Sequence, residues 1–147
     1  MKHIIKSIKW GSLALVIALA GCASAARDTS GFAITDDATV NAPFDKAWQL
    51  TKAVLREQNL DIYTRDKRGF FVAFTPSKRH WRLVPHRQKY TITLEEVSAT
   101  ATHISIETVN QVYGVTLLTY PDWHDRKATN DAEAKAILKA VQAKAGA

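Results

Sequence analysis

Apolar and polar residues alternate with two different periodicities along this chain, and these periodicities predict its helices and strands. Residues 44–58 carry apolar side chains at i, i+3, i+4 and i+7, which predicts a long amphipathic helix with Trp48 on its buried stripe. A second stripe predicts another helix over residues 130–145. Apolar residues at every second position predict strands. The predicted strands span residues 31–40, 60–66, 70–75, 90–97, 103–109 and, with no partner assigned, 112–120.

The order of these elements predicts the fold class. Short connections between the middle strands favour antiparallel pairing. Both helices are amphipathic, and one face of a sheet can cover both apolar stripes. We therefore expect an α+β two-layer sandwich, in which an antiparallel sheet of five or six strands carries one long helix after the first strand and a C-terminal helix.

Local signals predict how the elements are connected. Gly69 can supply the positive φ of a tight hairpin turn between residues 60–66 and 70–75. The prolines at positions 76 and 85 predict a break in the sheet over residues 75–88. Residues 121–129 are polar and are expected to form a loop. Asn130 and Glu133 have the spacing of a capping box at the start of the last helix.

The N-terminal 22 residues have the parts of a secretory signal. Three lysines precede a short apolar run, and small residues follow it. The run is shorter than the roughly 20 apolar residues of a membrane span. The only cysteine, Cys22, directly follows Leu19-Ala20-Gly21, and these four residues resemble the bacterial lipobox.

That resemblance implies cleavage between Gly21 and Cys22 and acylation of Cys22. It divides the chain into a signal peptide (1–21), an acylated cysteine with a tether (22–30) and a single domain (31–147). Two acyl chains anchor a protein firmly, whereas one is marginal. Because Ala23 rather than Asp follows the cysteine, the resemblance to enterobacterial sorting rules implies the periplasmic face of the outer membrane.

The strongest charge asymmetry lies between residues 67 and 89. This stretch holds seven basic and no acidic residues, although the whole chain is formally only +6. Such a segment can bind anionic head groups or an acidic protein, and it can equally be a solvated surface. Nucleic acid does not fit the compartment. The candidate anion- or partner-binding residues are Lys78, Arg79, Trp81, Arg82, Arg87 and Lys89.

No catalytic or cofactor motif is recognisable. The sequence has no G-x-S-x-G and no glycine-rich phosphate loop. The histidines have no recognised metal spacing, and the cluster Asp122, His124 and Asp125 is explained as well by a polar loop. A lone cysteine excludes an intrachain disulfide framework. We therefore expect no enzyme activity, no metal and no cofactor.

A further resemblance covers about residues 40–145. It is carried by Asn41-Ala42-Pro43-Phe44, Ala47-Trp48, Asp61-Ile62, Arg65-Asp66 and the Gly69-Phe70 strand start. These motifs resemble the domains of lipoprotein component C of the outer-membrane β-barrel assembly machine. The resemblance implies a helix-grip-like fold and an accessory or interaction role in cell-envelope assembly or maintenance. The wider helix-grip superfamily implies an alternative, a carrier or sensor with a small apolar ligand between helix and sheet.

Overall fold

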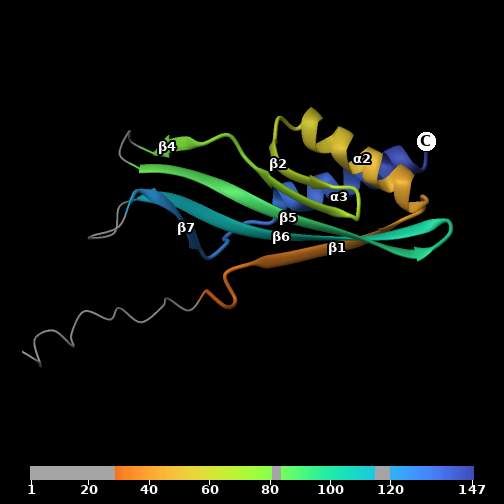
Figure 1. Cartoon of the computed structure of the whole chain (residues 1–147), viewed down its shortest axis with the longest axis horizontal. Coiled ribbons are helices and arrows are strands. Elements are labelled where there is room, and N and C mark those ends of the chain that lie inside the picture. The colour runs from red at the N-terminus through yellow and green to blue at the C-terminus, as the bar shows by residue number, and fades with distance from the viewer. Residues whose placement is uncertain (1–28, 81–83, 115–119) are drawn as a thin grey trace, which may run out of the picture.

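The computed structural model describes residues 29–80, 84–114 and 120–147. It is an α+β structure with one antiparallel sheet and two helices (Figure 1). This confirms the predicted fold class at that level. The elements in chain order are β1 (Ile34–Val40), α2 (Phe44–Glu57), β2 (Asp61–Asp66), β3 (Phe70–Phe74), β4 (Lys78–His80), β5 (Val84–Ser98), β6 (Ala101–Gly114), β7 (Asp122–Arg126) and α3 (Ala132–Ala145).

Two long central strands, β5 and β6, organise the sheet. The main strand order is β1-β6-β5-β3-β2, while β4 pairs with β5 and β7 pairs with β6. β1 and β3 flank the part of the sheet near the β5–β6 turn, and β4 and β7 flank the other part. We call this other part, made of β4, β7 and residues 84–88 and 110–114, the distal half. The sheet has seven strands rather than the five or six expected, because β4 and β7 were not predicted.

The predicted break over residues 75–88 is wrong in part, because β4 and the first residues of β5 pair there, whereas residues 75–77 lie outside the strands. Pro85 is tolerated because it lies opposite Arg79 of β4, whereas pairing of β5 with β6 begins only at His86. Its missing N–H therefore costs no hydrogen bond on the β6 side. The predicted loop over residues 121–129 is also wrong in part, because β7 occupies residues 122–126.

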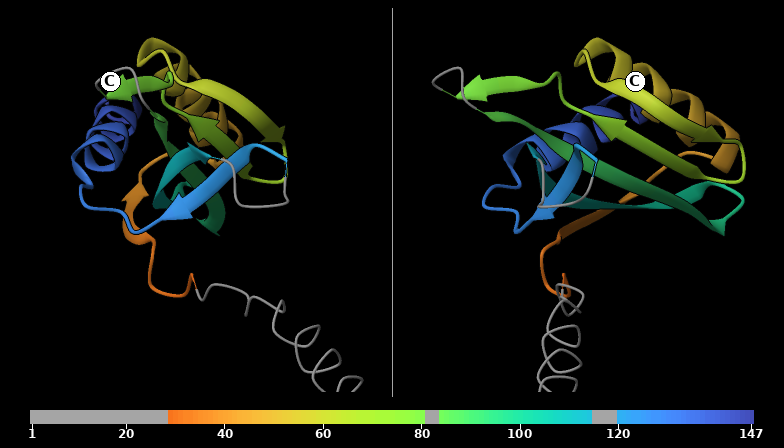
Figure 2. Two further views of the ribbon diagram at one scale, coloured as in Figure 1. Left: turned by 90° about the vertical axis from the view of Figure 1, so that its left-hand side faces the viewer. Right: turned by 60° about the vertical axis from the view of Figure 1, so that its left-hand side comes forward.

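Both helices lie on one face of the sheet, which we call the helix-side face (Figure 2). The helix α2 buries one stripe of mainly apolar side chains against the sheet. Trp48 lies in this stripe and is only 5% exposed, so the predicted burial of Trp48 is confirmed. The Trp48 ring lies 5.2 Å from the Phe71 ring, and its indole Nε1 donates to the Asp66 carbonyl at 2.8 Å. A large aromatic ring thus fills the space between α2 and the sheet.

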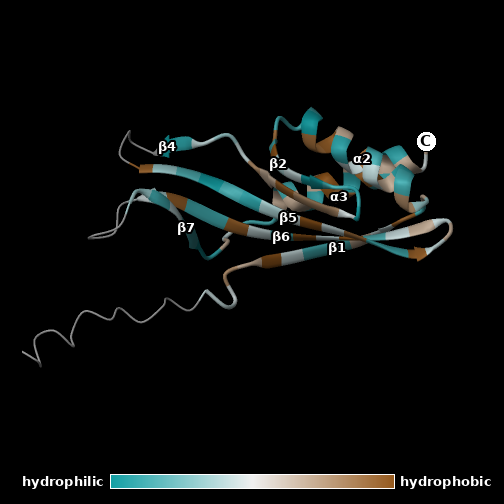
Figure 3. Cartoon of the chain, in the orientation of Figure 1, coloured by the Kyte–Doolittle hydropathy of each residue, from teal (hydrophilic) through white to brown (hydrophobic). Residues whose placement is uncertain are grey.

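The core is the layer between the helices and the sheet. Alternate residues of β3, β5 and β6 point into it, among them Phe71, Ile92 and Ile106, all fully buried. The opposite face, which we call the outer face, carries mostly polar and half-buried side chains, as an antiparallel sheet with one wet face does (Figure 3). The helix α3 closes the layer with the stripe Ala134, Ile137, Leu138 and Val141.

Two predicted end signals have different outcomes. Gly69 adopts φ +100°, as the hairpin turn requires, and its carbonyl accepts the Leu94 N–H at 2.7 Å. The capping box does not form, because α3 begins at Ala132 and Glu133 contacts Tyr90 instead. Asn130 still contributes, since its side-chain oxygen accepts the Ala132 N–H at 2.8 Å.

Candidate binding site in the distal half of the sheet

The distal half extends beyond both helices, so neither of its faces is covered by them (Figures 1 and 2). Side chains of successive strand residues point to opposite faces. This alternation divides the predicted basic residues. Lys78 lies on the helix-side face opposite His86, whereas Arg79, Arg87 and Lys89 belong to the outer face. The described residues of the basic segment therefore do not form one continuous surface.

A polar pocket of about 440 Å³ lies on the helix-side face. Two rows of side chains, each formed by paired residues of neighbouring strands, line this pocket. One row is Lys78, His86 and Val112, and the next is Gln88, Asn110 and Arg126. The residues that precede and open α3 form another part of the wall. The described residues that line it are Thr75, Lys78, His86, Arg87, Gln88, Asn110, Gln111, Val112, Arg126, Thr129, Asn130 and Glu133.

Hydrogen bonds hold the amides of the pocket in place. Gln88 Nε2 donates to Asn110 Oδ1 at 3.3 Å, and Asn110 Nδ2 donates to the Lys127 carbonyl at 3.1 Å. The hydroxyl oxygen of Thr75 accepts the Gln88 N–H at 2.9 Å, and that of Thr129 accepts from Asn110 Nδ2 at 3.4 Å. The pocket is thus a connected polar surface formed by several strands.

Tyr90 lies beneath this pocket and is fully buried. Its hydroxyl oxygen is 2.7 Å from Gln88 Oε1 and 2.8 Å from Glu133 Oε2, so its one hydrogen is donated to one acceptor at a time. Burial raises the pKa of Tyr90 well above its usual range, and the hydrogen bond and charge of Glu133 raise it further. The tyrosine therefore stays a neutral donor.

The charges around the pocket are predominantly positive. Within the described ranges, neither the Lys78 ammonium nor the Arg126 guanidinium has a carboxylate oxygen within 4 Å. Among the described residues of the lining, Glu133 is the one carboxylate, and it already accepts a hydrogen bond from Tyr90. Lys78 and Arg126 are therefore cations of this lining that have no ion-pair partner among the described residues.

Arg87 occupies a different environment on the outer face. Its guanidinium carbon lies 3.7 Å from the centre of the Phe74 ring and 4.0 Å from that of Trp123. Its Nε donates to Gln111 Oε1 at 2.8 Å, and Gln111 Nε2 donates to Asp125 Oδ1 at 2.8 Å. Burial lowers the pKa of Arg87, and the charges of Asp122 and Asp61 oppose that shift. We call Phe74, Arg87 and Trp123 the aromatic clamp.

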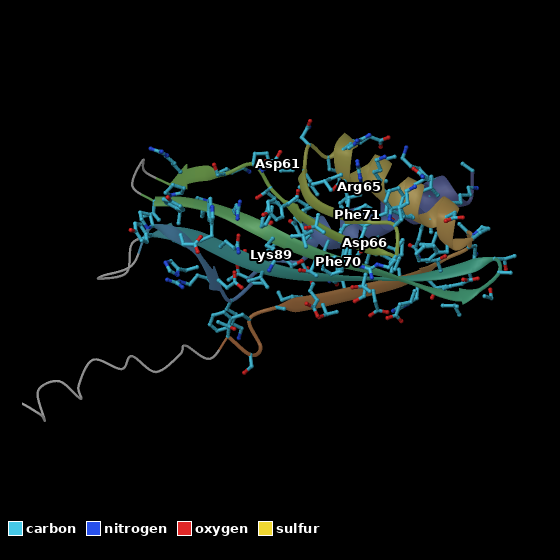
Figure 4. All side chains as sticks on the ribbon, viewed as in Figure 1. Asp61, Arg65, Asp66, Phe70, Phe71 and Lys89 are labelled. Carbon is cyan, nitrogen blue, oxygen red and sulfur yellow. The ribbon has the colours of Figure 1, made fainter. Side chains whose placement is uncertain are left out.

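A groove of about 610 Å³ runs beside this clamp. It is lined by Asp61, Ile62 and Tyr63 of β2 together with the three clamp residues. Tyr63 is 82% exposed although its ring lies 6.1 Å from that of Phe74. Asp61 begins β2 on the distal side, whereas Asp66 ends it beside the hairpin turn (Figure 4). An accessible aromatic ring, a guanidinium and a carboxylate therefore share one open groove.

Sequence reasoning missed several residues of these two sites, including Arg126, Glu133 and Trp123. Arg126 lies in a segment expected to be a loop, and Glu133 was assigned to a helix cap. Asp122 and His124 share one face of β7, whereas Asp125 belongs to the other face and accepts a hydrogen bond from Gln111. In the parts of the chain that the structure describes, no group of three or more His, Cys, Asp and Glu side chains could hold a metal ion.

Some predicted features lie outside the described residues. They are the signal peptide, Cys22, most of the tether, Trp81, Arg82 and residues 115–119 of the strand predicted over residues 112–120, whose first three residues belong to β6. Of the helices in the described ranges, none has the length and apolar character to cross a bilayer. The chain matches no known family model and no curated protein.

Proposed function

We propose that this chain is a lipoprotein anchored through Cys22 to the outer membrane and facing the periplasm. In this proposal it is a non-enzymatic accessory or interaction module in cell-envelope assembly or maintenance, with a helix-grip-like domain. The lipobox-like residues 19–22 support the anchor, and the short tether to residue 30 keeps the domain near the bilayer. The structure has a helix on an antiparallel sheet and a second helix at the C-terminus, which is compatible with the proposed helix-grip-like domain.

The packing beneath α2 is the observation that favours an interaction module over a carrier. A helix-grip carrier needs a cavity between its long helix and the sheet. Here Trp48 and Phe71 meet in that space, and Val54 and Leu55 on the same helix face are at most 1% exposed. The polar pocket instead lies in the distal half, and the outer groove lies between the distal half and β2, where partner groups can reach both from solvent.

The outer groove is the surface that we assign to a protein partner. Aromatic residues and arginine are enriched in the energetically dominant parts of protein interfaces. Tyr63 supplies an exposed ring, and Arg79 and Lys89 add positive charge on the same face. An envelope protein with an acidic surface would complement this arrangement.

The test places a photo-crosslinking amino acid at position 63 in the full chain, expressed in its native cells. A matched variant carries it at position 97, because Val97 is also exposed, at 62%, but lies near the β5–β6 turn. We expect a discrete crosslinked protein from position 63 and none from position 97. Removal of the anchor by Cys22→Ser should abolish palmitate incorporation and reduce the crosslink.

Two outcomes would contradict the proposal. Equal crosslinking from positions 63 and 97 would show that the groove is not a specific interface. Unchanged palmitate incorporation in Cys22→Ser would remove the lipoprotein assignment. The carrier alternative is tested separately. If the chain is a carrier, solvent extraction of the purified protein should release an apolar molecule in stoichiometric amount.

A further inference from the structure

We propose that the polar pocket on the helix-side face binds a phosphate-type oxyanion through Lys78 and Arg126. The oxyanion can belong to a small soluble molecule or to a phospholipid head group, since both present the same chemistry. This inference deepens the proposed function and rests on its assignment of the domain as a binding module. It requires neither the anchor at Cys22 nor a partner in the outer groove.

The pocket offers hydrogen-bond donors where an anion needs them. A lysine ammonium has three donors and no acceptor, and an arginine guanidinium has five and none. The oxygens of Thr75 and Thr129 already accept hydrogen bonds from their neighbours. Within the described ranges neither hydroxyl donates one, so each O–H hydrogen is available to a ligand. An excess of donors over acceptors is complementary to an oxyanion.

The electrostatics of the pocket have the same sign. Lys78 and Arg126 line it without a carboxylate within 4 Å among the described residues. Unpaired cations beside a concave surface attract anions more strongly than the same charges in open solvent. The first turn of α3 also lies at the pocket wall, because Glu133 of that turn is a lining residue. The N-terminus of a helix carries partial positive charge.

The arrangement of the donors favours a tetrahedral oxyanion. Lys78 projects from β4 on one side of β5 and β6, and Arg126 projects from β7 on the other side. The two threonines come from segments next to β3 and α3. Donors that approach from several directions suit the tetrahedrally arranged oxygens of a phosphate. The two oxygens of a carboxylate lie in one plane and match such an arrangement less well. Arginine supplies paired planar donors and lysine a point charge, a combination used in phosphate recognition.

The direct test measures binding of sn-glycerol 3-phosphate to the full chain in a neutral detergent by isothermal titration calorimetry. We expect saturable binding that Lys78→Gln and Arg126→Gln each weaken about tenfold or more, because each loses a charge-assisted hydrogen bond. Lys46→Gln is the matched control. It removes the same charge from an exposed position of α2, outside the lining of both pockets, and should leave the affinity unchanged.

A charge change of opposite sign separates electrostatics from structural damage. Glu133→Gln removes the pocket's carboxylate but keeps an oxygen that can accept from Tyr90. We expect this variant to bind glycerol phosphate several-fold more tightly. Lost folding would produce the opposite change, and circular dichroism of each variant checks folding independently.

The source of the phosphate is resolved in lipid nanodiscs. The full chain is placed in phosphatidylcholine with or without phosphatidic acid, and the glycerol phosphate titration is repeated. Equal affinity in both bilayers assigns the pocket to a soluble phosphate, and weaker affinity with phosphatidic acid assigns it to a head group. Absence of saturable binding, or equal binding by wild type, Lys78→Gln and Arg126→Gln, overturns the proposal. Neither result would alter palmitate labelling or crosslinking, so failure of the proposed function is distinguishable.

Discussion

The hydroxyl oxygen of Tyr90 in β5 lies 2.8 Å from Glu133 Oε2 in the first turn of α3. This contact joins the buried centre of the sheet to the start of the last helix. It also explains why the predicted capping box is absent, since the Glu133 side chain is directed to Tyr90. The wall of the polar pocket is therefore fixed from beneath by a buried side chain.

Removal of this hydroxyl should destabilise the fold. Tyr90→Phe leaves Gln88 Oε1 and Glu133 Oε2 without their shared donor. A partly buried acceptor that loses its partner costs about 1–3 kcal/mol. Urea unfolding should therefore show a lower free energy of unfolding by that amount. The control is Tyr63→Phe, which removes a hydroxyl from a side chain that is 82% exposed and should change stability by less than about 0.5 kcal/mol. Equal effects would contradict the assigned role of Tyr90.

The raised pKa of Tyr90 predicts how stability depends on pH. Burial, followed by the hydrogen bond and charge of Glu133, raises this pKa in the folded state. The unfolded chain titrates near pH 10, so the associated stability is complete below about pH 10 and is lost above it. The stability difference between wild type and Tyr90→Phe should fall by up to about 1.4 kcal/mol per pH unit above that point. A difference that stays constant between pH 9 and pH 11 would show that Tyr90 ionises in the folded state.

Gly69 provides a test of the hairpin turn that separates strain from collision. A Cβ at Gly69 would collide with the Leu94 carbonyl oxygen and lie 3.0 Å from Phe44 Cζ. At Gly31, where φ is also positive, a Cβ would meet no atom within 4 Å. Gly31→Ala should cost about 1 kcal/mol of backbone strain. Gly69→Ala should cost clearly more, on the order of 2–4 kcal/mol in denaturant unfolding. Similar costs would mean that the Gly69 turn can move away from Leu94.

Trp48 provides a test of the packing beneath α2. Trp48→Ala removes the ring that packs on Phe71 and the donor to the Asp66 carbonyl. The expected loss in the free energy of unfolding is about 3–5 kcal/mol. Gln49→Ala, at an exposed position of the same helix, should change it by less than about 0.5 kcal/mol. A loss below 1 kcal/mol for Trp48→Ala would reopen the carrier alternative, because the space would then be loosely filled.

The covered part of the sheet could be predicted from the sequence because the helices impose a pattern on it. One face of β3, β5 and β6 must be apolar beneath α2 and α3. The sequence around Phe71 and Ile92 therefore alternates between residues that point into the core and residues that point away from it. In the distal half no helix covers either face. The polar segment Asp122–Arg126 consequently lacks the alternation that reveals a strand, although it pairs with β6 along its whole length.

The candidate site was only partly predictable for a related reason. Counting charges identified Lys78 and Arg87, but it could not show that they lie on opposite faces. That separation depends on which residues of β4 and β5 are paired. Arg126 reaches the same pocket as Lys78 only through the register of β5, β6 and β7. Registers of this kind are set by tertiary packing, which local composition does not encode.

The aromatic clamp predicts that arginine is specifically required at position 87. Lysine would retain the charge at that position, but it has no planar group to stack on Phe74 and Trp123 together. It also lacks the Nε–H that is donated to Gln111. Stacking of a partly desolvated cation on an aromatic ring contributes about 0.5–2 kcal/mol. Arg87→Lys should therefore lower the free energy of unfolding by roughly 1–2 kcal/mol.

The matched control for Arg87→Lys is Arg79→Lys, because Arg79 is exposed on β4 and belongs to the same face. It should leave stability within about 0.5 kcal/mol of wild type. Near-ultraviolet circular dichroism adds a local readout, since the asymmetric environment of Trp123 depends on the stacked guanidinium. We expect Arg87→Lys to change this signal and Arg79→Lys to preserve it. If the two variants were equally stable and gave the same spectrum, any cation would suffice at position 87, and the groove beside it would lack the rigid wall on which the proposed partner surface depends.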